Sequence, residues 1–136
     1  MTYLAFKFAH VCIAIVAIGS SAALAVVLGF FTDDPVHGAF ALRVVRRLLW
    51  AIVVPGYVLM LATGMWMGHL ANLLDARWAE AAMNLWGFGA LFIGLTIWSV
   101  GRQIRGVGSA LAARLFSAGW GLVIVIILYF MLFKPT

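Results

Sequence analysis

Two histidines and two lysines carry the candidate chemistry of this chain, because each lies in or beside a strongly apolar segment. Lys7 and His10 stand three residues apart near the start, in the stretch YLAFKFAH. His69 follows the stretch GMWMG, and Lys134 closes the run LYFMLFK. Ionisable side chains are costly inside a bilayer, and those that occur there commonly mark functional sites.

Histidines in an apolar helical protein could hold a haem, because neutral imidazole is a good iron ligand and helical bundles carry cofactors between facing helices. We expect a b-type haem with His10 as the first ligand of the haem iron and His69 as a candidate second ligand. Lys7 or Lys134 would then neutralise a haem propionate at the membrane surface. Zinc or copper is less favoured, since no carboxylate or thiolate joins the histidines.

The same residues also have less specific roles that the sequence leaves open. His10 could transfer protons, or it could form a hydrogen bond between two helices. His69 could simply be solvated near the lipid headgroups. Lys7 could extend its ammonium group out of the membrane along its long stem.

The composition places these residues in a membrane protein. Hydrophobic residues make up 66% of the 136 residues, charged residues only 10%, and the mean hydropathy is +1.14. So short a chain could not bury this much apolar surface in water, so we expect one integral membrane domain over residues 1–136. The net charge of +5 would suggest nucleic acid for a soluble protein. Here the basic residues lie mostly in short connections, so we expect a lipid bilayer and no nucleic acid as partner.

Four segments are long and apolar enough to cross a bilayer, which takes about 20 residues. An open strand cannot pair its backbone groups in lipid, so we expect an all-α, integral membrane four-helix bundle. The stretch SSAALA in the first segment resembles a signal-peptide cleavage site, but the apolar run continues through VVLGFF and favours a retained span. The predicted spans cover residues of about 4–31, 48–70, 81–101 and 115–133.

Basic residues in the connections predict the orientation. The first and third connections carry three arginines each, whereas the second carries only Arg77. Basic loops tend to stay in the cytoplasm. We therefore expect a multi-pass protein of the bacterial inner (plasma) membrane with both termini on the outer, periplasmic side. The six arginines are Arg43, Arg46, Arg47, Arg102, Arg105 and Arg114.

This topology would collect unusual polar side chains in one leaflet. On the first helix, residues spaced three or four apart also share one face, and the side chains on that face are small beyond His10. Such a strip leaves space for close packing or for a flat ligand. The shared face consists of Tyr3, Lys7, His10, Ala14, Ala17 and Ser21. The polar side chains at one level of the membrane, the polar layer, are Lys7, His10, His69, Asn84, Tyr129 and Lys134.

The second helix carries two further signals. Pro55 lacks an amide hydrogen, so a kink is predicted near it. Gly64 and Gly68 form a G-x-x-x-G pattern, which we interpret as a packing face inside the bundle. The tryptophans near the predicted span ends are interpreted mainly as interfacial belts. They are Trp50, Trp66, Trp78, Trp86, Trp98 and Trp120.

Four stretches taken in order, YLAFKFAHV, LATGMWMGHLANL, WSVGRQIRGVG and LYFMLFKP, resemble the predicted membrane proteins called domain of unknown function 2269. The pair Lys7 and His10 and the closing Lys134-Pro135 are more distantly similar to the HemJ-type protoporphyrinogen oxidases and the CopD proteins. HemJ-type proteins are small four-helix membrane proteins that bind b-type haem. This resemblance implies a haem ligand at His10 and functional roles for Lys134 and His69. The stretch SAGWG replaces a polar, Arg- and Glu-containing stretch of that group, so haem binding is implied more strongly than oxidase activity.

Two function classes follow. The first is electron transfer or porphyrin redox chemistry by a haem protein, and whether it is an enzyme stays open. The alternative is a non-catalytic accessory subunit at the rim of a larger membrane complex, respiratory or photosynthetic, or a homo-oligomer. The sequence shows no nucleophile-and-base pair, phosphate loop or paired carboxylates, which argues against hydrolysis and phosphoryl transfer.

Overall fold

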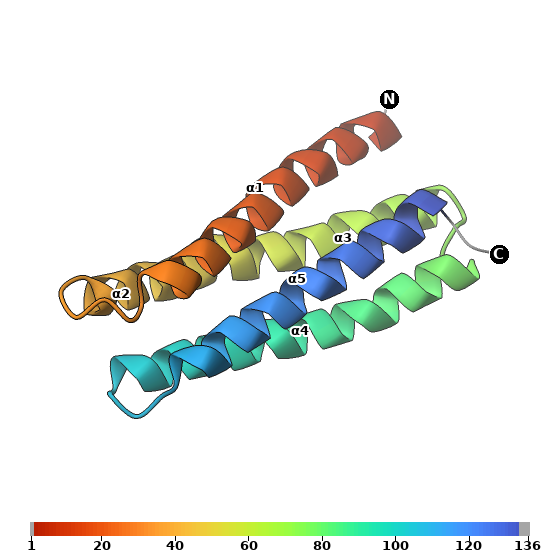
Figure 1. The fold of residues 1–136 in the computed structure, drawn as a ribbon. Coiled ribbons are helices and arrows are strands. Elements are labelled where there is room, and N and C mark those ends of the chain that lie inside the picture. Colours follow the sequence, from red (N-terminus) through yellow and green to blue (C-terminus); the bar gives the residue numbers. More distant parts are fainter. Residues whose placement is uncertain (1, 134–136) are drawn as a thin grey trace.

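The computed structural model describes residues 2–133 and is all-helical over that range. The chain runs up and down in long antiparallel helices, and the N-terminal end of the first lies at the same end of the bundle as the C-terminal end of the last (Figure 1). The elements are α1 (Thr2–Phe30), α2 (Gly38–Leu48), a π-helical turn η1 (Leu49–Val53), α3 (Val54–Leu70), α4 (Arg77–Ile104) and α5 (Ala110–Phe133).

Four helical segments of the described chain are long and apolar enough to cross a membrane, which confirms a multi-pass helical membrane protein. The second of them is one continuous run in which α2, η1 and α3 follow each other without a break. The connections 31–37 and 105–109 lie at one end of the bundle, and the connection 71–76 lies at the other (Figure 1). The two arginine-rich connections thus share one end of the bundle, as the distribution of basic residues predicts.

The helix that contains the predicted span 48–70 begins ten residues before it, at Gly38, so the assignment of residues 38–47 to a loop is wrong. Ala41, Leu42 and Val45 are buried on one face of α2, and the arginines between them are exposed. Such an amphipathic segment has low average hydropathy, so a search for apolar runs assigns it to a loop. Its helical structure is stabilised by burial of one face against α1 and α4.

A π-helical turn, η1, stands just before Pro55, where the sequence predicts a kink. Pro55 follows that turn by two residues and stands in the first turn of α3. A proline inside a continuous helix cannot donate to the preceding turn, and its ring crowds the carbonyl there. A wider π turn relieves that crowding without ending the helix.

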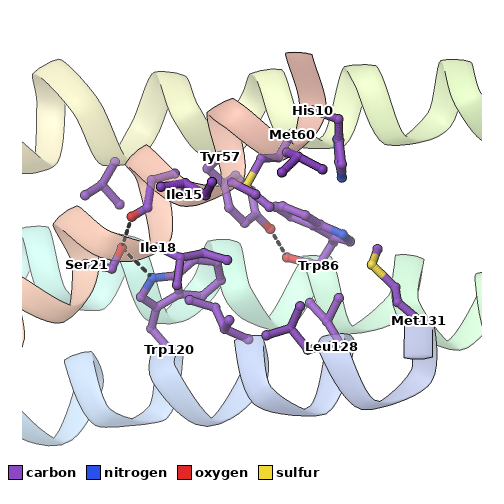
Figure 2. A pocket seen from close by; sticks show the side chains of 16 residues that line it. His10, Ile15, Ile18, Ser21, Tyr57, Met60, Trp86, Trp120, Leu128 and Met131 are labelled. Carbon is purple, nitrogen blue, oxygen red and sulfur yellow. Dashed lines mark hydrogen bonds between the residues drawn. The ribbon is translucent and has the colours of Figure 1, made fainter. Parts of the chain in front are cut away.

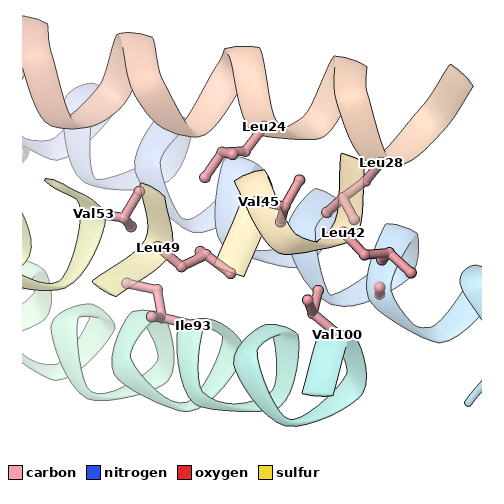
Figure 3. Close-up of a cluster of buried hydrophobic side chains, with 9 residues drawn as sticks. Leu24, Leu28, Leu42, Val45, Leu49, Val53, Ile93 and Val100 are labelled. Atoms are coloured by element: carbon pink, nitrogen blue, oxygen red, sulfur yellow. The ribbon is translucent and has the colours of Figure 1, made fainter. Parts of the chain in front are cut away.

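The largest buried cluster lies at the end of the bundle where α2 is inserted (Figure 3). Leu28 from α1, Val45 from α2, Val53 from η1 and Val100 from α4 are almost completely buried there. Because α2 brings extra side chains between α1 and α4, this end of the bundle is closed by aliphatic packing. The opposite end lacks the side chains of α2, and the cavity described below lies there.

Arg114 of α5 ties the end of α1 to the bundle. Its Nε donates to the carbonyl oxygen of Leu28 at 2.8 Å, and its Nη2 donates to the carboxylate of Asp33. Leu28 belongs to the last turn of α1, whose carbonyls lack helical partners. A cation there also interacts favourably with the negative end of the helix dipole.

Replacing Arg114 by Met should therefore destabilise the fold. We expect the free energy of unfolding to fall by about 1–3 kcal/mol, because two charge-assisted hydrogen bonds are lost. Unfolding by a denaturing detergent in mixed micelles measures the change. The control is Arg105→Met, which removes an exposed arginine at the same end. Equal stability of Arg114→Met and the control would contradict the role of Arg114.

Asp34 organises the connection between α1 and α2. One oxygen of its carboxylate accepts from the backbone amides of Val36 and His37, both at 2.7 Å. These hydrogen bonds, that of His37 first, lower the pKa of Asp34 from its ordinary value of 3.8. The charged form is therefore favoured in the folded state, and its contribution is present above pH 3.8 and lost as the pH falls further.

The pH dependence gives a direct check. We expect wild type to be more stable than Asp34→Ala at neutral pH, and we expect this difference to shrink as the pH falls below about 4. Detergent unfolding of both proteins between neutral and acidic pH measures it. A difference that does not change with pH would mean that the ionised carboxylate is not what orders this connection.

Candidate functional site

An apolar cavity of about 460 Å³ lies in the half of the bundle that α2 does not fill. Its walls come from α1, α3, α4 and α5, and Figure 2 shows the side chains that line it. This volume falls within the range of about 300–1,000 Å³ usual for small-molecule sites. His10 lines one end of this cavity, with Met131 of α5 close to the same level (Figure 2).

The face predicted on the first helix is the face that lines this cavity. His10, Ala14, Ala17 and Ser21 all border it. The small side chains at 14 and 17 leave the space open, as the step of three and four residues along α1 suggested. Tyr3 and Lys7 continue the same face toward the N-terminus, but they are exposed.

His10 is half-buried and makes one hydrogen bond, between its Nδ1 and the hydroxyl of Thr63 on α3 at 2.7 Å. The same hydroxyl oxygen lies 2.7 Å from the carbonyl oxygen of Leu59, which can only accept. Both bonds are satisfied when the Thr63 hydroxyl donates to Leu59 and accepts from the Nδ1–H of His10. This tautomer leaves a lone pair on Nε2.

The His10 ring lies at the end of the cavity. In Figure 2 the far edge of the ring points toward the level of Trp86 and Met131. The structure gives Nε2 no hydrogen-bond partner among the described residues. A neutral imidazole with one nitrogen held and the other bare is the usual arrangement of a metal-ligating histidine. The helix-to-helix hydrogen bond and the ligand role therefore use different nitrogens and are compatible.

A constant antiparallel register between α1 and α3 places His10 beside Thr63. A Cβ added at Gly56 would lie only 2.8 Å from the Cβ of Ala17, so the two backbones approach closely there. Seven residues further along each helix, in opposite directions, His10 meets Thr63. Gly64 continues this contact, since its added Cβ would lie 3.4 Å from Cε1 of His10.

The G-x-x-x-G pattern serves packing within the chain, as predicted. Gly64 lies against His10, and an added Cβ at Gly68 would lie 2.7 Å from Leu74 in the following connection. Both glycines thus make room for neighbours inside this bundle.

His69 lies apart from His10 in this arrangement. It stands six residues beyond Thr63 on α3, which is roughly 9 Å along the helix axis at 1.5 Å per residue. Its ring is exposed and lies 6.4 Å from that of Trp66. His69 does not line the cavity, so the structure brings only His10 of the two histidines to it.

The remaining members of the predicted polar layer do not gather around His10. Lys7, Asn84 and Tyr129 are exposed on their helices. Tyr129 packs its ring on Phe133, with the centroids 4.9 Å apart. Lys134 lies outside the described residues, so its predicted role stays a prediction.

Aromatic side chains form the inner wall of the cavity. Trp86 and Trp120 face the ring of Tyr57, with ring centroids 4.2 and 5.4 Å from it. The Tyr57 hydroxyl donates to the carbonyl of Trp86, and the indole N–H of Trp120 donates to the hydroxyl of Ser21 at 3.2 Å. The Tyr57 hydroxyl and the Trp120 indole N–H are thus paired, and the surface offered to the cavity is largely apolar.

The interpretation of Trp86 and Trp120 as interfacial residues is therefore wrong. Trp86 is only 7% exposed, and Trp120 is half-buried beside it. Both pack against Tyr57, and nothing in the sequence singles out Tyr57 beyond its place after Pro55 and Gly56. Tyrosine and tryptophan are buried where their polar atoms find partners, and those partners come from other helices. Trp50, Trp66 and Trp98 are exposed, as the belt interpretation requires.

The cavity offers one nitrogen ligand and no cluster for a bare metal ion. Among residues 2–133, no group of three or more histidine, cysteine or acidic side chains comes together. The site can therefore bind an apolar molecule that needs a single axial or hydrogen-bonding contact.

Comparison with known proteins gives no relative: no protein-family model, curated protein or solved structure matches the chain. The resemblances drawn from the sequence motifs therefore stay predictions.

The close approach of α1 and α3 can be tested with two matched substitutions. Gly56→Ala should lower the free energy of unfolding by about 1–3 kcal/mol, because the added methyl group overlaps Ala17. Gly19→Ala meets nothing within 4 Å and should be neutral or stabilising by up to about 1 kcal/mol. Detergent unfolding measures both. If the two variants had the same stability, the close contact at Gly56 would be wrong.

Proposed function

We propose that this protein binds a b-type haem in the cavity, with Nε2 of His10 as the iron ligand. The observation that carries this proposal is the position of His10, which lines the end of a cavity with apolar walls while its Nδ1 is hydrogen-bonded to Thr63. The hydrogen bond from Nδ1 to Thr63 would fix the tautomer and the plane of the ring, as such second partners do for metal ligands.

The cavity fits a flat apolar group with polar edges. The small side chains of Ala14 and Ala17 leave space on the α1 side of the cavity, and Trp86 and Trp120 offer ring faces for stacking. Lys7 lies one helical turn from His10 toward the N-terminal end of α1 and is exposed. Its ammonium group would pair with a propionate at the membrane surface, where a carboxylate remains hydrated.

The haem would supply one-electron chemistry, and the protein would tune it through the ligand and the apolar surroundings. His10 would be the histidine that holds the haem, because His69 lies outside the cavity lining. A haem held by a single histidine would favour porphyrin redox chemistry over simple electron transfer. The Met131 side chain near the level of His10 (Figure 2) would restrict access to this end of the cavity.

We place the protein in the bacterial inner membrane, with the connections 31–37 and 105–109 on the cytoplasmic side. The support is the arginine content of the segments that flank them, together with the observed pairing of connections. His10 would then lie toward the outer leaflet.

The absorption spectrum of purified protein tests haem binding. After loading with haem we expect a Soret band and, on reduction, sharp α and β bands. His10→Ala should lower the affinity for haem at least about tenfold, since even the loss of a hydrogen-bond partner of a metal ligand costs that much. Added imidazole should restore the bands. His69→Ala is the matched control and should keep full occupancy.

Two results would reject the proposal. The first is wild-type protein that takes up no stoichiometric haem. The second is a His10→Ala protein that keeps full occupancy and an unchanged spectrum. Loss of haem in His69→Ala as well would mean that both histidines ligate the iron, contrary to the placement of His69.

The accessory-subunit alternative has one observation in its favour. No residue of α1 before Ala17 is buried, although this half of the helix is long and apolar. A partner helix could cover it and close the cavity. Purification separates the alternatives, because a colourless protein recovered only with larger membrane partners would favour the subunit role.

A further inference from the structure

We propose a second site, in which Arg43, Arg46 and Arg47 bind the phosphate of an anionic phospholipid at the end of the bundle opposite to His10. The three arginines and Trp50, Ala51 and Ile104 line an open groove of about 690 Å³. The groove lies between the α2–η1 segment and the end of α4. It does not depend on the proposed haem.

The arginines are held on one face of a fixed helix. Positions 43, 46 and 47 are three and four residues apart and therefore share a face. The opposite face of α2 is fixed by Leu42 and Val45 in the main buried cluster. The helix fixes where the three side chains begin, and the planar guanidinium group suits two-pronged contacts with phosphate oxygens.

No carboxylate side chain of the chain is free to neutralise these arginines. The sequence contains only four acidic residues, all of them described. Asp33 pairs with Arg114, and Asp34 accepts from two backbone amides and lies 3.3 Å from His37. Asp75 and Glu80 lie at the other end of the bundle. An anion that neutralises the three arginines of this groove would therefore have to come from another molecule.

The position of the groove relative to the membrane surface favours a lipid headgroup as that anion. The apolar run from Leu48 to Leu70 would span roughly 33 Å at 1.5 Å per residue, close to the hydrocarbon thickness of about 30 Å. The arginines lie just beyond its end, at headgroup level. The rest of the lining, Trp50, Ala51 and Ile104, is apolar and would contact the acyl chains. A soluble phosphate would contact only the arginines.

Native mass spectrometry of the full chain released from detergent micelles tests the site. Phosphatidylglycerol and phosphatidylcholine with the same acyl chains are added at equal concentrations. We expect phosphatidylglycerol to be retained several-fold more strongly. Arg46→Gln should weaken that retention about fivefold, the effect of one basic residue at a membrane surface. Arg46→Lys keeps the charge but not the planar fork, so it should fall between Gln and wild type.

The matched control is Arg105→Gln, which removes the same charge at the same end but outside the groove lining. It should retain phosphatidylglycerol as wild type does. Equal retention of the two lipids by wild type, or equal weakening in Arg46→Gln and Arg105→Gln, would overturn the site. Displacement of the lipid by millimolar inorganic phosphate would show that free phosphate is the ligand and would overturn the lipid assignment.

Discussion

The close contact of α1 with α3 is the constraint on which the rest of this bundle depends. Helices in lipid gain no hydrophobic energy from meeting each other, so their association relies on close packing between small residues. Gly56 provides that closeness under Ala17. Once this contact fixes the register, His10 necessarily lies beside Thr63, two helical turns away along both helices.

The two ends of the bundle differ because α2 is present at only one of them. At that end, Leu42 and Val45 of α2 fill the space between α1 and α4, and the arginines of α2 point outward. At the other end no segment of residues 2–133 is inserted in this way, and the space between α1, α3, α4 and α5 remains as the cavity. Tyr57 and Trp120 line the cavity and also pack against the aliphatic cluster, so the two regions are in contact there. The same insertion thus accounts for both the aliphatic core and the proposed lipid groove.

Hydropathy and helical periodicity predicted much of this fold. The four spans follow from runs of apolar residues, and the cavity face of α1 follows from the spacing of His10, Ala14, Ala17 and Ser21. The irregular turn before Pro55 follows from proline's missing amide hydrogen. These features depend on the local sequence, so a single sequence contains the information for them.

Features that depend on the rotation and register of separate helices could not be predicted in the same way. The amphipathic α2 was assigned to a loop, because only contact with α1 and α4 reveals its buried face. Trp86 looked like an interfacial residue until Tyr57 and Trp120 were placed against it. His69 and His10 occur on the same side of the predicted topology, but the rotation of α3 leaves His69 exposed. The sequence also gave no sign that Thr63 would be the partner of His10.

The most direct test of the candidate site is the tautomer of His10 in haem-free protein. Nitrogen-15 NMR of histidine-labelled protein in lipid bilayers distinguishes a protonated ring nitrogen from a bare one, and comparison with a His10→Gln sample assigns the signals. We expect Nδ1 to carry the hydrogen and Nε2 to be bare, because the Thr63 hydroxyl accepts from Nδ1 and donates to Leu59. A protonated Nε2 with a bare Nδ1 would contradict the arrangement and would remove the ligand from the proposed site.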